Sequence, residues 1–265
     1  MRITSLQNPR IKNVVKLQQS RQRTRQRKFL IEGYRAILHA VERRYPLQEL
    51  YICPSLFFGK NESALIQRAA DAGVAIIEVD ESPFRKMAIR QRPEGLLAVA
   101  PQLHHLLVDH QPMNDGFYLI AEAIEKPGNL GTILRSADGA GASGVIVSNP
   151  GTDLWHPDVV RGSVGAFFAM PLFQSTTKET IAWCCQHGIR TLAATPQAKQ
   201  LYTDANMIGP IAIAVGTEQY GLSDAWLSQA DERIKLPMFG SANSLNVAVA
   251  ATILLYEVVR QRMER

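Results

Sequence analysis

Three polar segments in the second half of the chain carry side chains that could hold and orient a substrate. Each lies where a predicted strand or turn ends, and ligands of open α/β sheets bind at the carboxyl ends of parallel strands. Taken alone, each segment has an ordinary explanation, because turn glycines and helix N-caps use the same residue types. Three of them in one half-chain instead indicate a ligand site. They are residues 125–137, 211–222 and 236–247.

The polar side chains of these segments suggest binding and alignment of a reacting group. The first segment predicts a Pro-Gly turn and then a helix that Asn129 opens and that carries Arg135 about a turn and a half later. The second runs from an apolar strand into a turn that contains Glu218. The third is a Gly/Ser/Asn loop that enters the last predicted helix through Ser244 and Asn246.

Other patterns in the chain carry less chemistry. Residues 139–144 match GxGxxG, but a helix precedes and a strand follows them, which reverses the dinucleotide-binding order, so we interpret them as a helix end and tight turn. His104, His105 and His110 lie in or directly before the predicted linker, without a Cys or carboxylate cluster, so we expect solvated histidines and no metal. The three cysteines, an odd number without CxxC, indicate reduced and packed thiols.

Positive charge is concentrated at the amino-terminal end. Residues 1–44 contain twelve Lys or Arg and two acidic residues, a balance of +10, so the remaining residues sum to −5 against the total of +5. Such a segment favours a polyanionic partner, although a solvated charged face is the simpler alternative. The side chains that we expect to contact the phosphates of such a partner are Arg10, Lys12, Arg21, Arg23, Arg25, Arg27 and Lys28.

The elements that must position these residues fall into two α/β domains. We predict an N-terminal domain at residues 1–105, a linker at 106–116 and a second domain at 117–265. The expected strands are residues 47–53, 74–79, 95–100, 117–122, 144–148, 189–194 and 211–216. The expected helices are residues 62–72, 83–91, 129–139, 158–164, 178–187, 223–229 and 245–262.

Composition indicates a globular protein with a real core. Hydrophobic residues make up 46% of the 265-residue chain. No secretory leader is recognised, and the longest apolar stretch, residues 247–255, is shorter than the ~20 residues that a membrane span requires. We therefore expect a soluble cytoplasmic protein without a membrane partner.

In order and spacing, the three polar segments resemble the motifs of the SpoU/TrmH family of RNA ribose 2′-O-methyltransferases, within the SPOUT superfamily. Residues 5–12 and 29–33 are similar to the opening of family members that have an N-terminal substrate-binding domain resembling a ribosomal protein. The chain differs where Glu125 and Lys126 replace a frequent acidic pair, and where Val249 replaces Ser or Ala. We expect neither difference to touch a reactive group.

The resemblance implies an architecture and a cofactor. The second domain is expected to be a doubly wound α/β sheet with a deep trefoil knot, working as a homodimer and using S-adenosyl-L-methionine. The cofactor-binding residues that it implies are Thr195, Gly216, Leu236, Met238 and Leu245. No metal is needed for methyl transfer from a sulfonium, which agrees with the lack of a metal-ligand cluster in the sequence.

The resemblance also implies roles for the polar residues. Because a guanidinium is effectively always protonated, we favour Arg135 as the group that binds a phosphate and stabilises developing alkoxide charge, rather than as the base. Asn129 and Glu218 would orient Arg135 and the loops, while Ser244 and Asn246 would fix the third segment and reach the ribose. The expected substrate is structured RNA, and the resemblance favours ribosomal RNA. The alternatives are transfer RNA, a catalytically inactive RNA-binding module and, on the glycine pattern alone, a nucleotide-cofactor oxidoreductase.

Overall fold

The computed structural model describes residues 2–264, which form two compact units. The first unit comprises the described residues up to Leu103 together with Trp155–Ala169, and the second contains the rest. Within residues 2–264, no helix has the length and apolar character needed to cross a membrane. The units are defined by contacts and not by function, so the assignment of residues 1–105 to substrate binding and 117–265 to methyl transfer stays a prediction.

The first unit is built on a mixed five-stranded sheet in the order β1-β4-β3-β5-β2. Strands β1, β4 and β3 are parallel, whereas β5 is antiparallel to both of its neighbours. The three strands predicted in this part of the chain are present. The strands are β1 (Arg2–Ile3), β2 (Lys28–Glu32), β3 (Glu49–Ile52), β4 (Ala75–Val79) and β5 (Leu96–Pro101).

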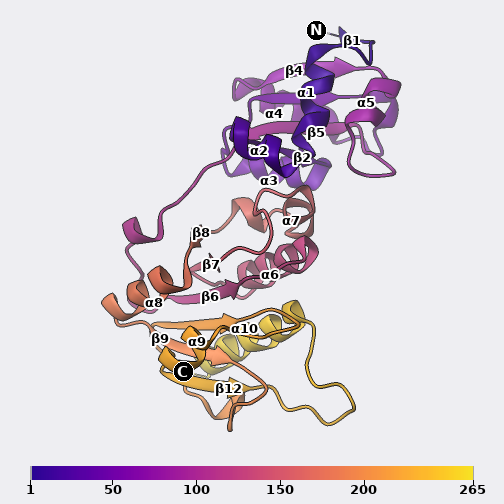
Figure 1. The fold of residues 1–265 in the computed structure, drawn as a ribbon. Coiled ribbons are helices and arrows are strands. Elements are labelled where there is room, and N and C mark those ends of the chain that lie inside the picture. The colour runs from indigo at the N-terminus through magenta and orange to yellow at the C-terminus, as the bar shows by residue number, and fades with distance from the viewer. Residues whose placement is uncertain (1, 265) are drawn as a thin grey trace. The chain divides into compact units, whose positions relative to one another are not determined.

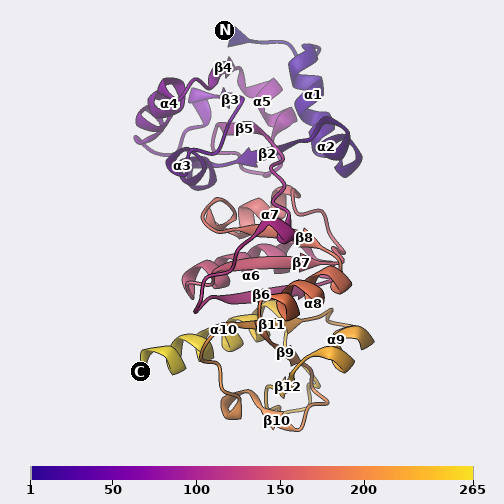
Figure 2. The ribbon, with the colours of Figure 1, turned by 90° about the vertical axis from the view of Figure 1, so that its left-hand side faces the viewer.

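Helices cover both faces of this sheet. The helices α1 (Pro9–Leu17) and α5 (Glu81–Met87) bury their apolar side chains against one face, and α2 (Ser20–Gln26) packs beside α1. Figure 2 shows α3 (Tyr34–Glu42) and α4 (Glu62–Asp71) on the opposite face of the sheet from α1 and α2. The one-sided apolar pattern of α1, with Ile11, Val14 and Leu17 buried, explains why it lies flat on the sheet.

One segment from the second half of the sequence is part of the first unit. The helix α7 (Pro157–Gly162) packs against β2, and the Trp155 and Phe167 rings lie 5.0 Å and 5.7 Å from the Phe29 ring. The predicted helix at 158–164 is thus present. The position of α7 beside β2 could not be predicted from the sequence. Aromatic packing between two distant segments produces no hydrophobic periodicity within either segment.

The second unit contains a seven-stranded sheet that is parallel throughout, in the order β10-β12-β9-β11-β6-β7-β8 (Figure 1, with β10 and β11 labelled in Figure 2). The strand order reverses between β6 and β11, and in such sheets ligands bind outside the carboxyl ends at this switch point. The strands are β6 (Phe117–Glu122), β7 (Gly144–Ser148), β8 (Leu172–Ser175), β9 (Arg190–Ala194), β10 (Gln200–Leu201), β11 (Ile211–Val215) and β12 (Glu232–Lys235).

Two helix pairs cover this sheet. The helices α6 (Pro127–Gly139) and α10 (Val247–Met263) pack on each other, as do α8 (Thr177–Gln186) and α9 (Asp224–Gln229). The expected Ser/Asn start of the last helix is confirmed, because the Asn246 side chain caps α10 by accepting a hydrogen bond from the Ala248 amide at 3.0 Å.

The predicted linker is better ordered than expected. Residues from His104 onward belong to the second unit, and His105 pairs with Phe173 beside β8. His110 corrects the expectation of solvated histidines: its ring is half-buried between aromatic side chains, and its Nε2 lies 3.0 Å from the Tyr118 hydroxyl. Burial is the main cause that lowers the pKa of His110, so the ring is neutral at pH 7.

Candidate functional site

The three polar segments meet at the switch point of the parallel sheet. Glu218 follows β11, Asn129 lies in the first turn of α6, and Asn246 caps α10. Asn129 Nδ2 and Asn246 Nδ2 both donate to Glu218 Oε1, at 2.9 Å and 2.6 Å. One residue from each segment therefore joins a single hydrogen-bonded cluster around the Glu218 carboxylate. The roles that the sequence analysis gave these residues stay predictions.

Asn246 links the cluster to a helix terminus. Its Oδ1 is occupied by the α10 cap, which leaves Nδ2 to donate to Glu218 and, at 3.2 Å, to Asn129 Oδ1. The cap thus fixes the orientation of the amide as well as its position. A side chain that could only accept or only donate would lose one of the two functions.

Lys126 is a fourth member that sequence reasoning missed. Its Nζ forms an ion pair with Glu218 Oε2, so the expectation that the Glu125-Lys126 difference touches no reactive group is wrong. Lys126 is the main cause that holds the pKa of the Glu218 carboxyl below its usual range, and Glu218 raises the pKa of the Lys126 ammonium. A lysine at the N-terminus of α6 opposes the helix dipole, and the Glu218 carboxylate offsets that repulsion.

A cavity of about 530 Å³ opens beside this cluster. Its lining comes from the turn after β9, the loop after β11, and the chain from β12 into α10. A volume in this range accommodates a cofactor-sized ligand. All five residues that the family resemblance implied for the cofactor line it, and they are Thr195, Gly216, Leu236, Met238 and Leu245.

Gly216 shows how closely the backbone is packed at the cavity wall. A Cβ atom at this position would lie 2.1 Å from the Gly221 carbonyl oxygen and 2.4 Å from the Leu222 amide nitrogen. Thr217 and Gly221 exchange backbone hydrogen bonds, which close the loop into a tight hairpin that carries Glu218. Only glycine therefore fits where this loop leaves β11.

Arg135 and Ser244 lie outside the hydrogen-bonded cluster. The Arg135 side chain is exposed on α6, and it forms no hydrogen bond or ion pair with any residue in the described part of the chain. Ser244 lines the cavity and is also exposed, again without a hydrogen bond among residues 2–264. Both side chains are thus available to a ligand.

Glu122 is a second residue that the sequence analysis did not select. It ends β6 with only 3% of its surface exposed, and its carboxylate accepts hydrogen bonds from Thr177 and Ser223. The available signal was an acidic residue at the end of the otherwise apolar run FYLIA. Buried acidic residues are rare unless they are paired, so this position merited attention.

The basic amino-terminal segment is helical and not uniformly exposed. Arg23 corrects the expectation of phosphate contact: it is 1% exposed, and its Nη1 donates to the Leu17 and Gln18 carbonyls at 3.0 Å and 2.7 Å. Packing of α2 on α1 turns this one arginine inward. Arg10, although exposed, is paired with Glu49 at 2.7 Å.

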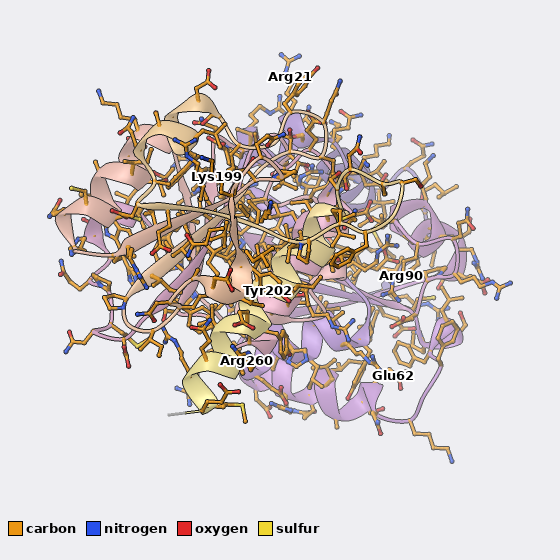
Figure 3. All side chains as sticks on the ribbon, turned by 90° about the horizontal axis from the view of Figure 1, so that it is seen from below. Arg21, Glu62, Arg90, Lys199, Tyr202 and Arg260 are labelled. Atoms are coloured by element: carbon orange, nitrogen blue, oxygen red, sulfur yellow. The ribbon has the colours of Figure 1, made fainter. Side chains whose placement is uncertain are left out.

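The remaining basic side chains of this segment face solvent. Figure 3 shows Arg21 projecting away from the protein. Arg25 and Arg27 are also exposed, as is Lys12 on α1, whereas Lys28 is partly covered at the start of β2. Neither α1 nor α2 contains an acidic residue, so neither helix neutralises these cations from within.

Two family models match the chain. The model described as the SpoU rRNA Methylase family matches residues 116–256, which span the sheet of the second unit and all three polar segments. The model described as an MRM3-like substrate binding domain matches residues 8–98.

Individual relatives match over almost the whole chain. A 23S rRNA (uridine(2479)-2′-O)-methyltransferase of Streptomyces viridochromogenes is 33% identical over 91% of this chain and 85% of its own length. A crystal structure of an RNA 2′-O ribose methyltransferase is 41% identical, with a TM-score of 0.86 and coverage of 99% and 100%. The AdoMet-bound rRNA methyltransferase of Sinorhizobium meliloti is 29% identical, with a TM-score of 0.90 and coverage of 98% and 97%.

Proposed function

The chain belongs to the SpoU rRNA methylase family, and from that membership we propose that it methylates a ribose 2′-hydroxyl of ribosomal RNA with S-adenosyl-L-methionine. The observation that carries the proposal is the position of the Glu218 cluster beside the cavity, at the switch point of the parallel sheet. A methyl donor in the cavity and a ribose at its mouth would meet next to this cluster.

The cavity residues fit the cofactor. Gly216 lets the hairpin at the cavity wall close tightly, and Leu236 and Leu245 supply apolar surface for an adenine ring. Thr195 and Ser244 add polar groups at the wall. Related structures contain bound AdoMet. When bound, the cofactor supplies an electrophilic methyl group on a sulfonium.

This chain's own residues would bind and align the ribose. Arg135 is exposed and has no hydrogen-bond or ion-pair partner within residues 2–264. It is therefore available to bind the phosphate next to the target nucleotide. Its positive charge would also stabilise the alkoxide that develops on the 2′-oxygen. Asn129 and Asn246 hold Glu218 in place, and Glu218 holds Lys126. Ser244, which is free at the cavity wall, is positioned to donate a hydrogen bond to the ribose. The hydroxyl proton passes to a phosphate oxygen or to water.

The basic surface of the first unit would bind the RNA backbone. Arg21, Arg25, Arg27 and Lys12 are exposed, and the segment from residue 8 to 98 matches a substrate-binding family model. Cations on one surface attract phosphates without reading sequence. The folded N-terminal domain, which the resemblance compares with a ribosomal protein, would then select the shape of the RNA.

The finer architecture forms part of the same proposal. A trefoil knot in the second domain is supported by the way in which three separate segments, ending with residues 243–247, line one cavity. A homodimer is supported by Val249 and Tyr256, which are about half exposed and lie seven residues apart on one face of α10. A protein of this activity would work in the cytoplasm.

Radiolabelled methyl transfer tests the proposed function. The protein is incubated with tritiated S-adenosyl-L-methionine and with ribosomal or transfer RNA from a strain that lacks its gene. We expect label in ribosomal RNA. Label in transfer RNA alone would instead support the alternative substrate, and cofactor binding without transfer to either RNA would support the inactive RNA-binding module.

A further inference from the structure

Glu122 and its neighbour Ala121 hold the two ends of the loop that carries Glu218. Val215, the last residue of β11, pairs with Ala121 next to Glu122 in β6. After the loop, the Ser223 backbone amide and hydroxyl each donate to the Glu122 carboxylate at 2.8 Å. The last two residues of β6 thus fix where the 216–222 loop begins and where it ends.

The same residue fixes the start of the first polar segment. Ala123, directly after Glu122, has a φ of 53°, in the left-handed region that alanine rarely adopts. The chain turns there toward Lys126 and Asn129, and the Ala123 amide donates to the Ser148 carbonyl at 2.9 Å. A strained residue of this kind persists when its surroundings leave the chain no alternative.

Buried hydrogen bonds supply that constraint. The Thr177 hydroxyl also donates to Glu122 Oε1, and Ser148 Oγ lies 3.1 Å from Thr177 Oγ1. Glu122 therefore receives three hydrogen bonds, all from neutral donors, while it is 97% buried. Removing the carboxylate would leave the Ser223 amide and the Thr177 hydroxyl without their acceptor inside the protein.

We propose that Glu122 is a positioning residue for methyl transfer, whose buried carboxylate sets the distance between Asn129 and Glu218 by holding their two segments together. The proposal rests on the proposed function, because it concerns the same site. Glu122 is buried and does not line the cavity, so it acts through Ser223 and Ala123.

Two substitutions test this role in the full chain. Ser223→Ala removes one hydrogen bond to Glu122 Oε1 on the side of the loop. Thr177→Val removes one to the same oxygen on the side of α8, and it also removes the hydrogen bonds of the Thr177 hydroxyl with Asn149 and Ser148. We expect Thr177→Val to lower the melting temperature more than Ser223→Ala does. Ser223→Ala should raise the Kd for S-adenosylhomocysteine and lower kcat by about three- to tenfold, whereas Thr177→Val should change both by less than about twofold.

Rescue by a conservative variant completes the test. In Glu122→Gln the amide oxygen can still accept from the Ser223 amide, and the Nε2 group can donate to hydroxyls that rotate. We expect it to retain most of the activity that Glu122→Ala loses. Two results would contradict the role of Glu122 and leave the proposed function intact. One is an equal change of Kd and kcat in Ser223→Ala and Thr177→Val, and the other is an equal loss of activity in Glu122→Gln and Glu122→Ala. A wild-type protein without methyl transfer would instead contradict the proposed function.

Discussion

Glu218 accepts hydrogen bonds from two segments that are far apart in the sequence and also forms an ion pair with Lys126. The pair is largely exposed, so it contributes little to folding stability. Its value lies in keeping Glu218 ionised and oriented. The amides of Asn129 and Asn246 can donate to Glu218 Oε1 together only while that oxygen is an acceptor.

Removal of the Lys126 charge should change the pH dependence of the reaction. Lys126 holds the pKa of Glu218 below its usual range, so in Lys126→Ala that pKa should rise toward its ordinary value. The wild-type carboxylate remains ionised until the pH falls through its lowered pKa. In the variant, the acid limb of kcat should therefore begin at a higher pH. Methyl-transfer rates from about pH 4 to pH 7 measure this shift, with Lys126→Arg as the control that keeps the cation. Superimposable acid limbs for wild type and Lys126→Ala would refute it.

Arg135 should affect chemistry and not cofactor binding. Because its side chain is exposed on α6 and does not line the cavity, Arg135→Ala should leave the Kd for S-adenosylhomocysteine within a few-fold of wild type. Methyl transfer should fall by at least about 100-fold, the usual scale for losing a group that stabilises developing charge. Calorimetric titration and a transfer assay give the two values, and Asp138→Ala, exposed on the same helix, is the control. If cofactor affinity and methyl transfer fell in parallel in Arg135→Ala, Arg135 would instead support the wall of the cavity.

Sequence reasoning succeeded for residues whose position follows from a strand end. Asn129, Glu218 and Asn246 follow apolar runs or open helices, so their meeting at one sheet edge could be predicted. Lys126 and Glu122 could not be assigned in this way, because an ion pair across 92 residues and a buried acceptor depend on tertiary packing. The prediction that Arg23 contacts phosphate failed for the same reason, because only the packing of α2 on α1 turns this side chain inward.

Among the elements, α2 combines two kinds of arginine. Arg21, Arg25 and Arg27 are exposed, whereas Arg23 is buried against the end of α1. We expect the triple replacement of the exposed arginines by Gln to reduce the slope of log affinity for RNA against log salt by about 0.7–0.9 for each lost phosphate contact. Cofactor affinity should not change. RNA binding at several salt concentrations measures the slope, and an unaltered slope would leave these arginines as a solvated charged face.

Arg23 provides the contrasting variant on the same helix. Arg23→Gln should cost about 1–3 kcal/mol of unfolding free energy, because the Leu17 and Gln18 carbonyls would lose their donor. The salt slope of RNA binding should stay at its wild-type value. Denaturant titration and the same binding assay separate the two effects.

The loop after β11 leaves no space at its first residue. In Gly216→Ala the new methyl group would meet the Gly221 carbonyl within 2.1 Å, so the hairpin must shift and move both the cavity wall and Glu218. We expect the Kd for S-adenosylhomocysteine to rise at least about tenfold, a cost in the range of overpacking. Gly188→Ala is a control for backbone strain without a clash in the same unit, because its φ of 62° strains an alanine while the new Cβ would meet nothing within 4 Å. An unchanged Kd in Gly216→Ala would show that the loop tolerates displacement.

At the scale of the whole molecule, the sequence predicted two α/β domains. It did not predict that the first unit contains a segment from the second half of the chain. Seven of the twelve strands in the described part of the chain follow from apolar runs between turn residues, whereas β1, β2, β8, β10 and β12 were not predicted. The inclusion of Trp155–Ala169 in the first unit does not follow, because its aromatic contacts join β2 to a segment more than 100 residues away. The local sequence pattern thus predicted the α/β fold class. Which unit each segment belongs to depends on tertiary contacts, which the local pattern does not contain.

The central claim is that the whole protein methylates a ribose oxygen in ribosomal RNA. A methylated 2′-oxygen cannot attack the adjacent phosphate, so alkaline hydrolysis leaves the modified position as a dinucleotide. The measurement is transfer of tritiated methyl groups to ribosomal RNA from a strain without the gene, followed by complete alkaline hydrolysis. We predict label in alkali-resistant dinucleotides with wild-type protein and none above background with Arg135→Ala. Label released entirely as mononucleotides, which marks methylation of a base, would contradict the account.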